Sequence, residues 1–139
     1  MAPPALGVID ARAFPLVHIQ GPNLVPGDGP RIIEDLETLI QHAQEFVLVI
    51  VNGDDPPQRQ HDEDKARMLW LKQNKALLAK VCKGIVSVMP NRQRLLLIEK
   101  QATGLQAALG IRFLVTENLN EANAEALRLL EDVRLGLSS

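Results

Sequence analysis

Residues 46–57, which read FVLVIVNGDDPP, decide the fold of this chain. Six consecutive apolar residues, four of them β-branched, give way to Asn-Gly and then to two prolines, as at the end of a buried strand. A strand without polar alternation has to be covered on both of its faces. We therefore expect a central strand at 46–51, with Val49 as its most deeply buried residue, and the rest of the chain packed around it.

The composition indicates one ordinary globular domain over residues 1–139, with 46% apolar and 23% charged residues. We expect residues 1–13 and 136–139 to be poorly ordered. A net charge of −2 gives no overall attraction to nucleic acid, and no apolar run is long enough to span a membrane. A single cysteine cannot form an internal disulfide, and the chain begins without a secretion-type segment, so we expect a cytoplasmic protein.

Strand-like and helix-like patterns alternate along the whole chain. This order predicts parallel pairing and a layered α/β domain of about four strands and four helices. We expect an edge strand that begins after Pro15, because proline suits a strand start at an edge. The expected strands lie at 16–20, 46–51, 85–89 and 111–116, and the expected helices at 30–44, 62–83, 92–109 and 119–135.

Each helix has apolar residues at helical spacing that predict its buried face. The third helix has an alternative, because Gly104 weakens a helix interior and residues 95–98 could instead form the return strand of a hairpin. Glu34, Asp35 and Glu37 lie early in the first helix, where its dipole favours anions. Gly84 is expected to end the second helix and Gly110 the third. The predicted buried residues are Ile33, Leu36, Ile40 and Ala43; Ala66, Leu69, Trp70, Leu77 and Val81; Leu95, Ile98, Ala102, Leu105 and Leu109; and Ala122, Ala126, Leu129 and Val133.

The order and apolar pattern of the segments 14–17, 46–51, 65–83 and 84–90 resemble bacterial STAS-like proteins. These are small relatives in fold of anti-sigma-factor antagonists and of the cytoplasmic domains of sulfate transporters. The resemblance implies a STAS-like α/β fold over roughly residues 8–135. In phosphoregulated members a serine or threonine lies near the start of the helix that follows the central strand. Here residues 52–62 contain neither, which puts control by a kinase in doubt.

Polar residues follow three of the expected strands, in the loops 52–62, 90–94 and 116–118. Ligands bind at the carboxyl ends of strands in open α/β sheets, so these loops are the candidate site for a small anionic ligand. Asp54 and Asp55 after Asn52 could hold a magnesium ion or form an acidic turn. His61 beside Asp62 could be an oriented base or simply precede a helix. Asn91, Arg92 and Arg94 open a helix and could take an anion, or the arginines could be solvated.

Charge is distributed unequally along the chain. Residues 59–100 carry a net charge of +6 and the remainder −8. Lys72 and Lys75 belong to the basic part, which could attract an acidic protein, whereas the alternative is an ordinary solvated helix surface. His18, His42 and Cys82 have no metal-ligand spacing, and we expect Cys82 to be a small buried residue.

These patterns favour a non-enzymatic, cytosolic interaction or regulatory module that binds a protein partner, with no cofactor and no metal. The alternative is a binder of a small anionic ligand, or an enzyme, that uses the three loops. We also expect a homodimer. The four adjacent apolar residues of 95–98 extend over more than a full helical turn, so at least one must face outward and invite a second copy.

Overall fold

The computed structural model describes residues 7–20, 27–52 and 61–134 and has the predicted α/β architecture. Four strands alternate with four helices in that part of the chain. The strands are β1 (Leu16–Gln20), β2 (Phe46–Val51), β3 (Cys82–Val88) and β4 (Phe113–Thr116). The helices are α1 (Asp28–His42), α2 (His61–Val81), α3 (Arg92–Leu109) and α4 (Leu119–Arg134).

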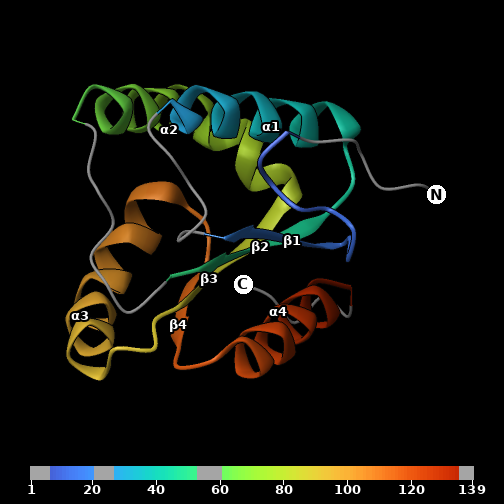
Figure 1. The fold of residues 1–139 in the computed structure, drawn as a ribbon. Coiled ribbons are helices and arrows are strands. Elements are labelled where there is room, and N and C mark those ends of the chain that lie inside the picture. The colour runs from blue at the N-terminus through green and yellow to red at the C-terminus, as the bar shows by residue number, and fades with distance from the viewer. Residues whose placement is uncertain (1–6, 21–26, 53–60, 135–139) are drawn as a thin grey trace.

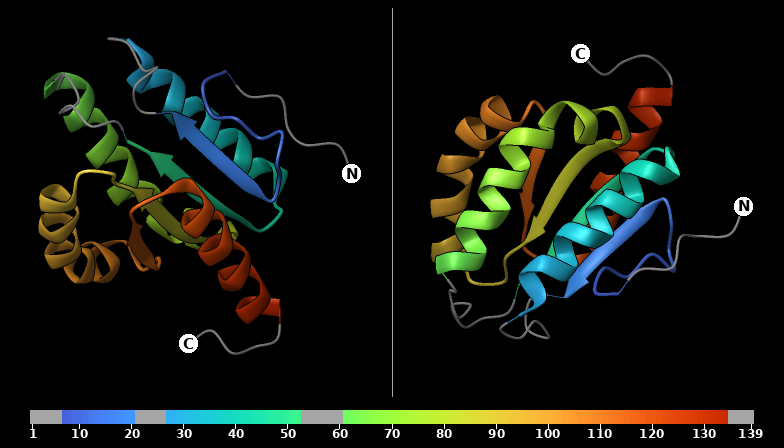
Figure 2. Two further views of the ribbon diagram at one scale, coloured as in Figure 1. Left: turned by 60° about the horizontal axis from the view of Figure 1, so that its bottom comes forward. Right: turned by 90° about the horizontal axis from the view of Figure 1, so that it is seen from above.

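The four strands form one parallel sheet in the order β1-β2-β3-β4, which is their order in the chain. Helices α1 and α2 cover one face of this sheet and α4 covers the other (Figure 1). Helix α3 lies beyond α2, on the side of β4 (Figure 2). The prediction that β1 is an edge strand is confirmed, and β2 is central, with Val49 in register between His18 and Val86.

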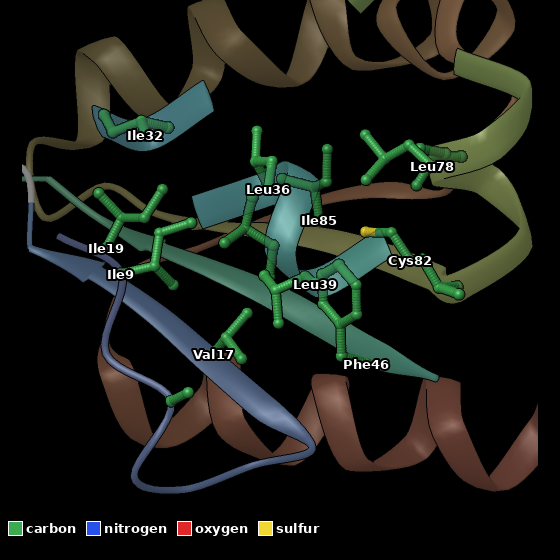
Figure 3. Packing of buried hydrophobic residues seen from close by; sticks show 14 residues of the cluster. Ile9, Val17, Ile19, Ile32, Leu36, Leu39, Phe46, Leu78, Cys82 and Ile85 are labelled. Carbon is green, nitrogen blue, oxygen red and sulfur yellow. The ribbon is translucent and has the colours of Figure 1, made fainter. Parts of the chain in front are cut away.

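The residues of β2 point alternately into two apolar cores. Phe46 and Leu48 lie in the core under α1 and α2, part of which Figure 3 shows. Val47 and Val49 lie in a second core with Ala122, Ala126 and Leu129 of α4. Val49 is fully buried, as predicted. The uninterrupted apolar run of β2 therefore reflects two helical layers that cover the two faces of the same strand.

Gly84 lies within β3 and does not end the preceding helix as predicted, because α2 stops at Val81. A Cβ atom on Gly84 would lie 2.5 Å from Cδ1 of Leu129, which is itself buried. The missing side chain thus lets α4 approach β3 closely. Cys82 accordingly belongs to a strand and not to a helix end.

Asp35 has a role that its position in α1 does not indicate. Its carboxylate is buried and accepts hydrogen bonds from the backbone N–H groups of Gly7, Val8 and Ile9, at 2.9, 2.6 and 2.8 Å. Just beyond these residues, Asp10 and His18 exchange two backbone hydrogen bonds of 2.8 Å. Residues 7–13, expected to be poorly ordered, are therefore held against α1 and along the outer edge of β1, while 1–6 and 136–139 lie outside the described residues.

The predicted helix faces need several corrections. In α1 the buried residues are Gly29, Ile32, Asp35, Leu36 and Leu39, whereas Ala43 is exposed and follows the helix with a positive φ. In α2, Ala66, Leu69 and Leu77 are exposed and Leu78 is buried instead, whereas the predicted burial of Val81 is confirmed. The helix at 92–109 is confirmed, ends at Gly110 with φ of 69°, and excludes the hairpin alternative. The side chains of Leu105, Leu109 and Val133 lie outside the described part.

The two-sided burial of β2 predicts that Val49→Asp prevents folding, because an unpaired carboxylate in an apolar core costs as much as a large share of a domain's stability. Circular dichroism during heating shows whether the variant has a cooperative unfolding transition. Val49→Ala, the control, should fold with a loss of roughly 2 kcal/mol. A cooperatively melting Val49→Asp protein would contradict the two-core arrangement.

Substitution of Asp35 by Asn should lower the free energy of unfolding by about 2–4 kcal/mol. The negative charge is lost, and the amide nitrogen that replaces one carboxylate oxygen cannot accept a hydrogen bond from the backbone. Urea unfolding measures the loss, and hydrogen exchange at the amides of Gly7, Val8 and Ile9 should accelerate. The control is Glu37→Gln, an exposed position on the same helix. Equal stability of the two variants would show that the Asp35 contacts contribute little.

Candidate functional site

The carboxyl ends of β2, β3 and β4 meet at one edge of the sheet, as the parallel order requires. The backbone N–H of Asn52 donates to the carbonyl of Val88, at 3.0 Å, and that of Met89 donates to the carbonyl of Thr116, at 2.8 Å. Arg92 approaches Glu117 at 3.3 Å across the next loop. The described parts of the three predicted loops are therefore neighbours in space.

The polar side chains at this edge are used within the protein. The Asn52 amide donates to the hydroxyl of Ser87 and to the carbonyl of Val88, at 2.9 and 3.0 Å. Asn91 caps α3, since its side-chain oxygen accepts from the backbone N–H of Arg94 at 3.1 Å. That bond occupies one of the free amides which an anion at the helix start would use.

The structure does not bring the other predicted site residues together among the residues that it describes. Asp54 and Asp55 lie outside the described residues, and so does the side chain of His61, the first residue of α2. Arg94 is half-buried, whereas Arg92 is exposed in its ion pair with Glu117. The small-ligand site at the loops 52–62, 90–94 and 116–118 stays a prediction.

Two titratable groups have pKa values moved by their surroundings. Hydrogen bonds from Arg12 hold the pKa of Asp10 at about 2. Burial raises the pKa of the Cys82 thiol to about 11, and the thiol donates to the carbonyl of Gly84 at 3.3 Å. Cys82 is therefore protonated at neutral pH, which suits the predicted small buried residue and not a nucleophile.

His18 and His42, which were considered as metal ligands in the sequence, each contact another side chain. One ring nitrogen of His18 lies 3.0 Å from the side-chain oxygen of Asn123, which links β1 to α4. The His42 ring packs edge-on against the Phe14 ring, with 5.4 Å between the two ring centroids. Within 7–20, 27–52 and 61–134, no group of three His, Cys, Asp or Glu side chains could hold a metal ion.

The most distinctive surface of the described chain lies on α2. We call it the α2 lysine face and define it by seven exposed residues on one side of the helix, which also includes the half-buried Ala79 near the C-terminal end. They are Lys65, Met68, Leu69, Lys72, Lys75, Ala76 and Lys80. Met68 and Leu69 are 49% and 57% exposed, so the arc combines apolar side chains with positive charge.

The four lysines of this face have no ion pair with any described acidic residue. Lys83, in contrast, forms an ion pair, because its ammonium lies 3.5 Å from the carboxylate of Glu45. Lys72 and Lys75 were predicted as partner-binding residues and are indeed at the surface. Leu69 was missed, because its spacing on α2 had assigned it to the core.

A scan against protein-family models and searches of curated proteins and of solved structures gave no match. Membership of the STAS-like family stays a prediction from the sequence. No described helix has the length and apolar character needed to cross a membrane.

The buried Cys82 predicts that stability decreases as the pH rises above about 9. The unfolded chain then releases the thiol proton, whereas the folded protein keeps it until the pH approaches the raised pKa of about 11. Between pH 8 and pH 10.5, the buried thiol should lower the free energy of unfolding by about 2 kcal/mol. Urea unfolding at the two pH values measures this loss.

Cys82→Ala is the control for that measurement, because it removes the thiol and keeps every lysine that titrates in the same range. Between pH 8 and pH 10.5, the free energy of unfolding of Cys82→Ala should decrease by about 2 kcal/mol less than that of the native protein. An equal decrease in both proteins would mean that the thiol is not buried from solvent.

Proposed function

We propose that this protein is a non-enzymatic, cytosolic interaction module that binds an acidic protein partner on the α2 lysine face. The observation that supports the proposal is the set of four exposed lysines that make no ion pair with a described acidic residue, around the exposed side chains of Met68 and Leu69. Association with a partner would remove this apolar surface from water and give the lysines counter-charges.

The chemistry of the partner follows from this face. Along α2, Lys65 precedes and Lys72 follows the apolar pair Met68 and Leu69, so a complementary segment has acidic residues that flank one or two apolar ones. An amphipathic acidic helix has this pattern when it lies along a groove or a neighbouring helix. The predicted STAS-like family also binds proteins, although the missing hydroxyl residue in 52–62 removes its usual phosphoacceptor.

The interior use of Asn52 and Asn91 favours this proposal over the small-ligand alternative. The Asn52 amide nitrogen already donates within the protein. The Asn91 side-chain oxygen takes up the backbone N–H of Arg94, which an anion at the start of α3 would otherwise use. The α2 lysine face, in contrast, has its charged groups available to solvent.

Reversal of two charges by Lys72→Glu with Lys75→Glu should leave the melting transition intact, because both side chains are exposed. The probe is a labelled amphipathic helical peptide with glutamates on one side and leucines on the other, and fluorescence anisotropy measures its binding. We expect the double variant to bind at least about tenfold more weakly. Added salt should weaken the native protein more than the variant.

Two controls make this test specific. Lys100→Glu changes one exposed lysine of α3 and should leave the affinity nearly unchanged. A peptide with the same composition in scrambled order should bind more weakly than the amphipathic one. Absence of peptide binding, equal binding by the double variant, or stronger binding to anionic lipid vesicles would each overturn the proposal.

A further inference from the structure

The homodimer predicted from residues 95–98 has stronger support at another surface. Two leucines of that segment do face outward, since Leu96 and Leu97 are 49% and 58% exposed. The described surface around them does not indicate what covers them. The outer surface of α1 and α2, in contrast, has opposite charges on two neighbouring helices.

Helices α1 and α2 lie side by side over one face of the sheet (Figures 1 and 2). Each connects two neighbouring parallel strands, so the two helices run in the same direction. Their buried residues, among them Leu36 of α1 and Leu78 of α2, belong to one core. The opposite sides of the two helices therefore form one surface that faces away from the sheet.

The outer side of α1 is acidic, whereas that of α2 is the lysine face. Glu34 and Glu37 are exposed, and each lies about 200° around the helix from a buried leucine two residues later. Neither makes an ion pair with a described basic residue. The exposed cation of α1, Arg31, lies 3.9 Å from the carboxylate of Asp28.

The register of the sheet sets the relative heights of the two helices. Phe46 of β2 and Cys82 of β3 are register partners. Helix α1 ends four residues before Phe46, and α2 ends one residue before Cys82. The C-terminal ends of both helices therefore lie at the same end of the sheet.

Counted back from these ends, the opposite charges lie at matching heights. Glu34 is eight residues before the end of α1, and Lys72 is nine residues before the end of α2. For Glu37 and Lys75 the numbers are five and six. A difference of one residue is a rise of only about 1.5 Å along a helix.

This surface is complementary to itself under one twofold axis. If the axis runs parallel to the helices and between them, α1 of each copy covers α2 of the other, and every height is kept. Glu34 and Glu37 of one copy then meet Lys72 and Lys75 of the second. An axis across the helices would instead place α1 on α1 and bring like charges together. The first contact is isologous and closes into a dimer.

Apolar residues also match in this arrangement. Leu69 of α2 is 57% exposed and Pro30 of α1 is exposed, and each lies twelve residues before the end of its helix. Leu69 of each copy would thus cover Pro30 of the other. Burial of this surface adds to the charge pairs, which contribute little by themselves at an exposed position.

We propose that α1 of a second copy of this chain is an acidic partner of the α2 lysine face. In the resulting twofold dimer, Glu34 and Glu37 of each copy face Lys72 and Lys75 of the other. This inference rests on the proposed function, because it takes the same face as the binding surface and names an occupant. The dimer covers both lysine faces, so another acidic protein has to compete with it.

Sedimentation equilibrium of the whole chain from about 1 μM to about 1 mM tests the dimer. The native protein should dimerise at low salt with a dissociation constant of about 10–100 μM, and about 0.5 M NaCl should weaken it at least about tenfold. Glu34→Lys with Glu37→Lys should remain monomeric. The matched control, Glu99→Lys with Glu131→Lys, makes the same charge change at exposed positions of α3 and α4 and should dimerise like the native protein.

Exchange of the charges tests which helices meet. Lys72→Glu with Lys75→Glu makes both helices acidic, so this variant should also remain monomeric. Mixed with Glu34→Lys and Glu37→Lys in equal amounts, it should form a one-to-one dimer, because each helix again faces the opposite charge. A chain with all four substitutions has the native net charge and should dimerise like the native protein.

Each of these measurements can overturn the dimer. A monomeric native protein at every concentration, undiminished dimerisation of either double variant, or a monomeric fourfold variant would do so. The proposed function is tested separately, because Glu34→Lys with Glu37→Lys keeps the lysine face and should still bind the amphipathic acidic peptide. Binding of that peptide by a native protein that does not dimerise would overturn the dimer alone.

Discussion

The need to cover both faces of β2 organises the fold. Six apolar residues in a row cannot leave either face of the strand in water, so helices have to lie on both sides of the sheet. Because the sheet is parallel and follows chain order, α1 and α2 cover one face between the strands that they connect. The chain completes the other face after β4, when α4 folds back over Val47 and Val49.

The two edge strands of the sheet, β1 and β4, are covered in different ways. At β1, the segment that contains Asp10 adds two backbone hydrogen bonds to the edge, and Asp35 anchors the same segment through three amides. At β4, α3 supplies the cover but buries few of its own side chains. The first edge is thus closed by the segment that precedes β1, whereas the second is covered by a helix that leaves Leu96 and Leu97 exposed.

The polar groups are divided in a similar way between interior and surface roles. At the carboxyl ends of the strands, Asn52, Asn91 and Thr116 make hydrogen bonds within the protein, which suits a rigid edge more than an open binding site. Four exposed lysines that make no ion pair with a described acidic residue lie on α2 instead. A helix that buries only a narrow strip against the sheet can devote the rest of its circumference to a partner.

Local apolar periodicity was enough to predict the strand and helix order, the central place of Val49 and the two-sided core. The cap of α4 is local in the same sense, because the Asn118 side chain accepts from the N–H of Glu121, three residues further on, at 2.8 Å. Tertiary structure decided which residues of α2 are buried, because several arcs of that helix are apolar enough to pack. It likewise decided the roles of Asp35 and Gly84. Their partners, residues 7–9 and Leu129, are distant along the chain, and only the folded arrangement brings them into contact.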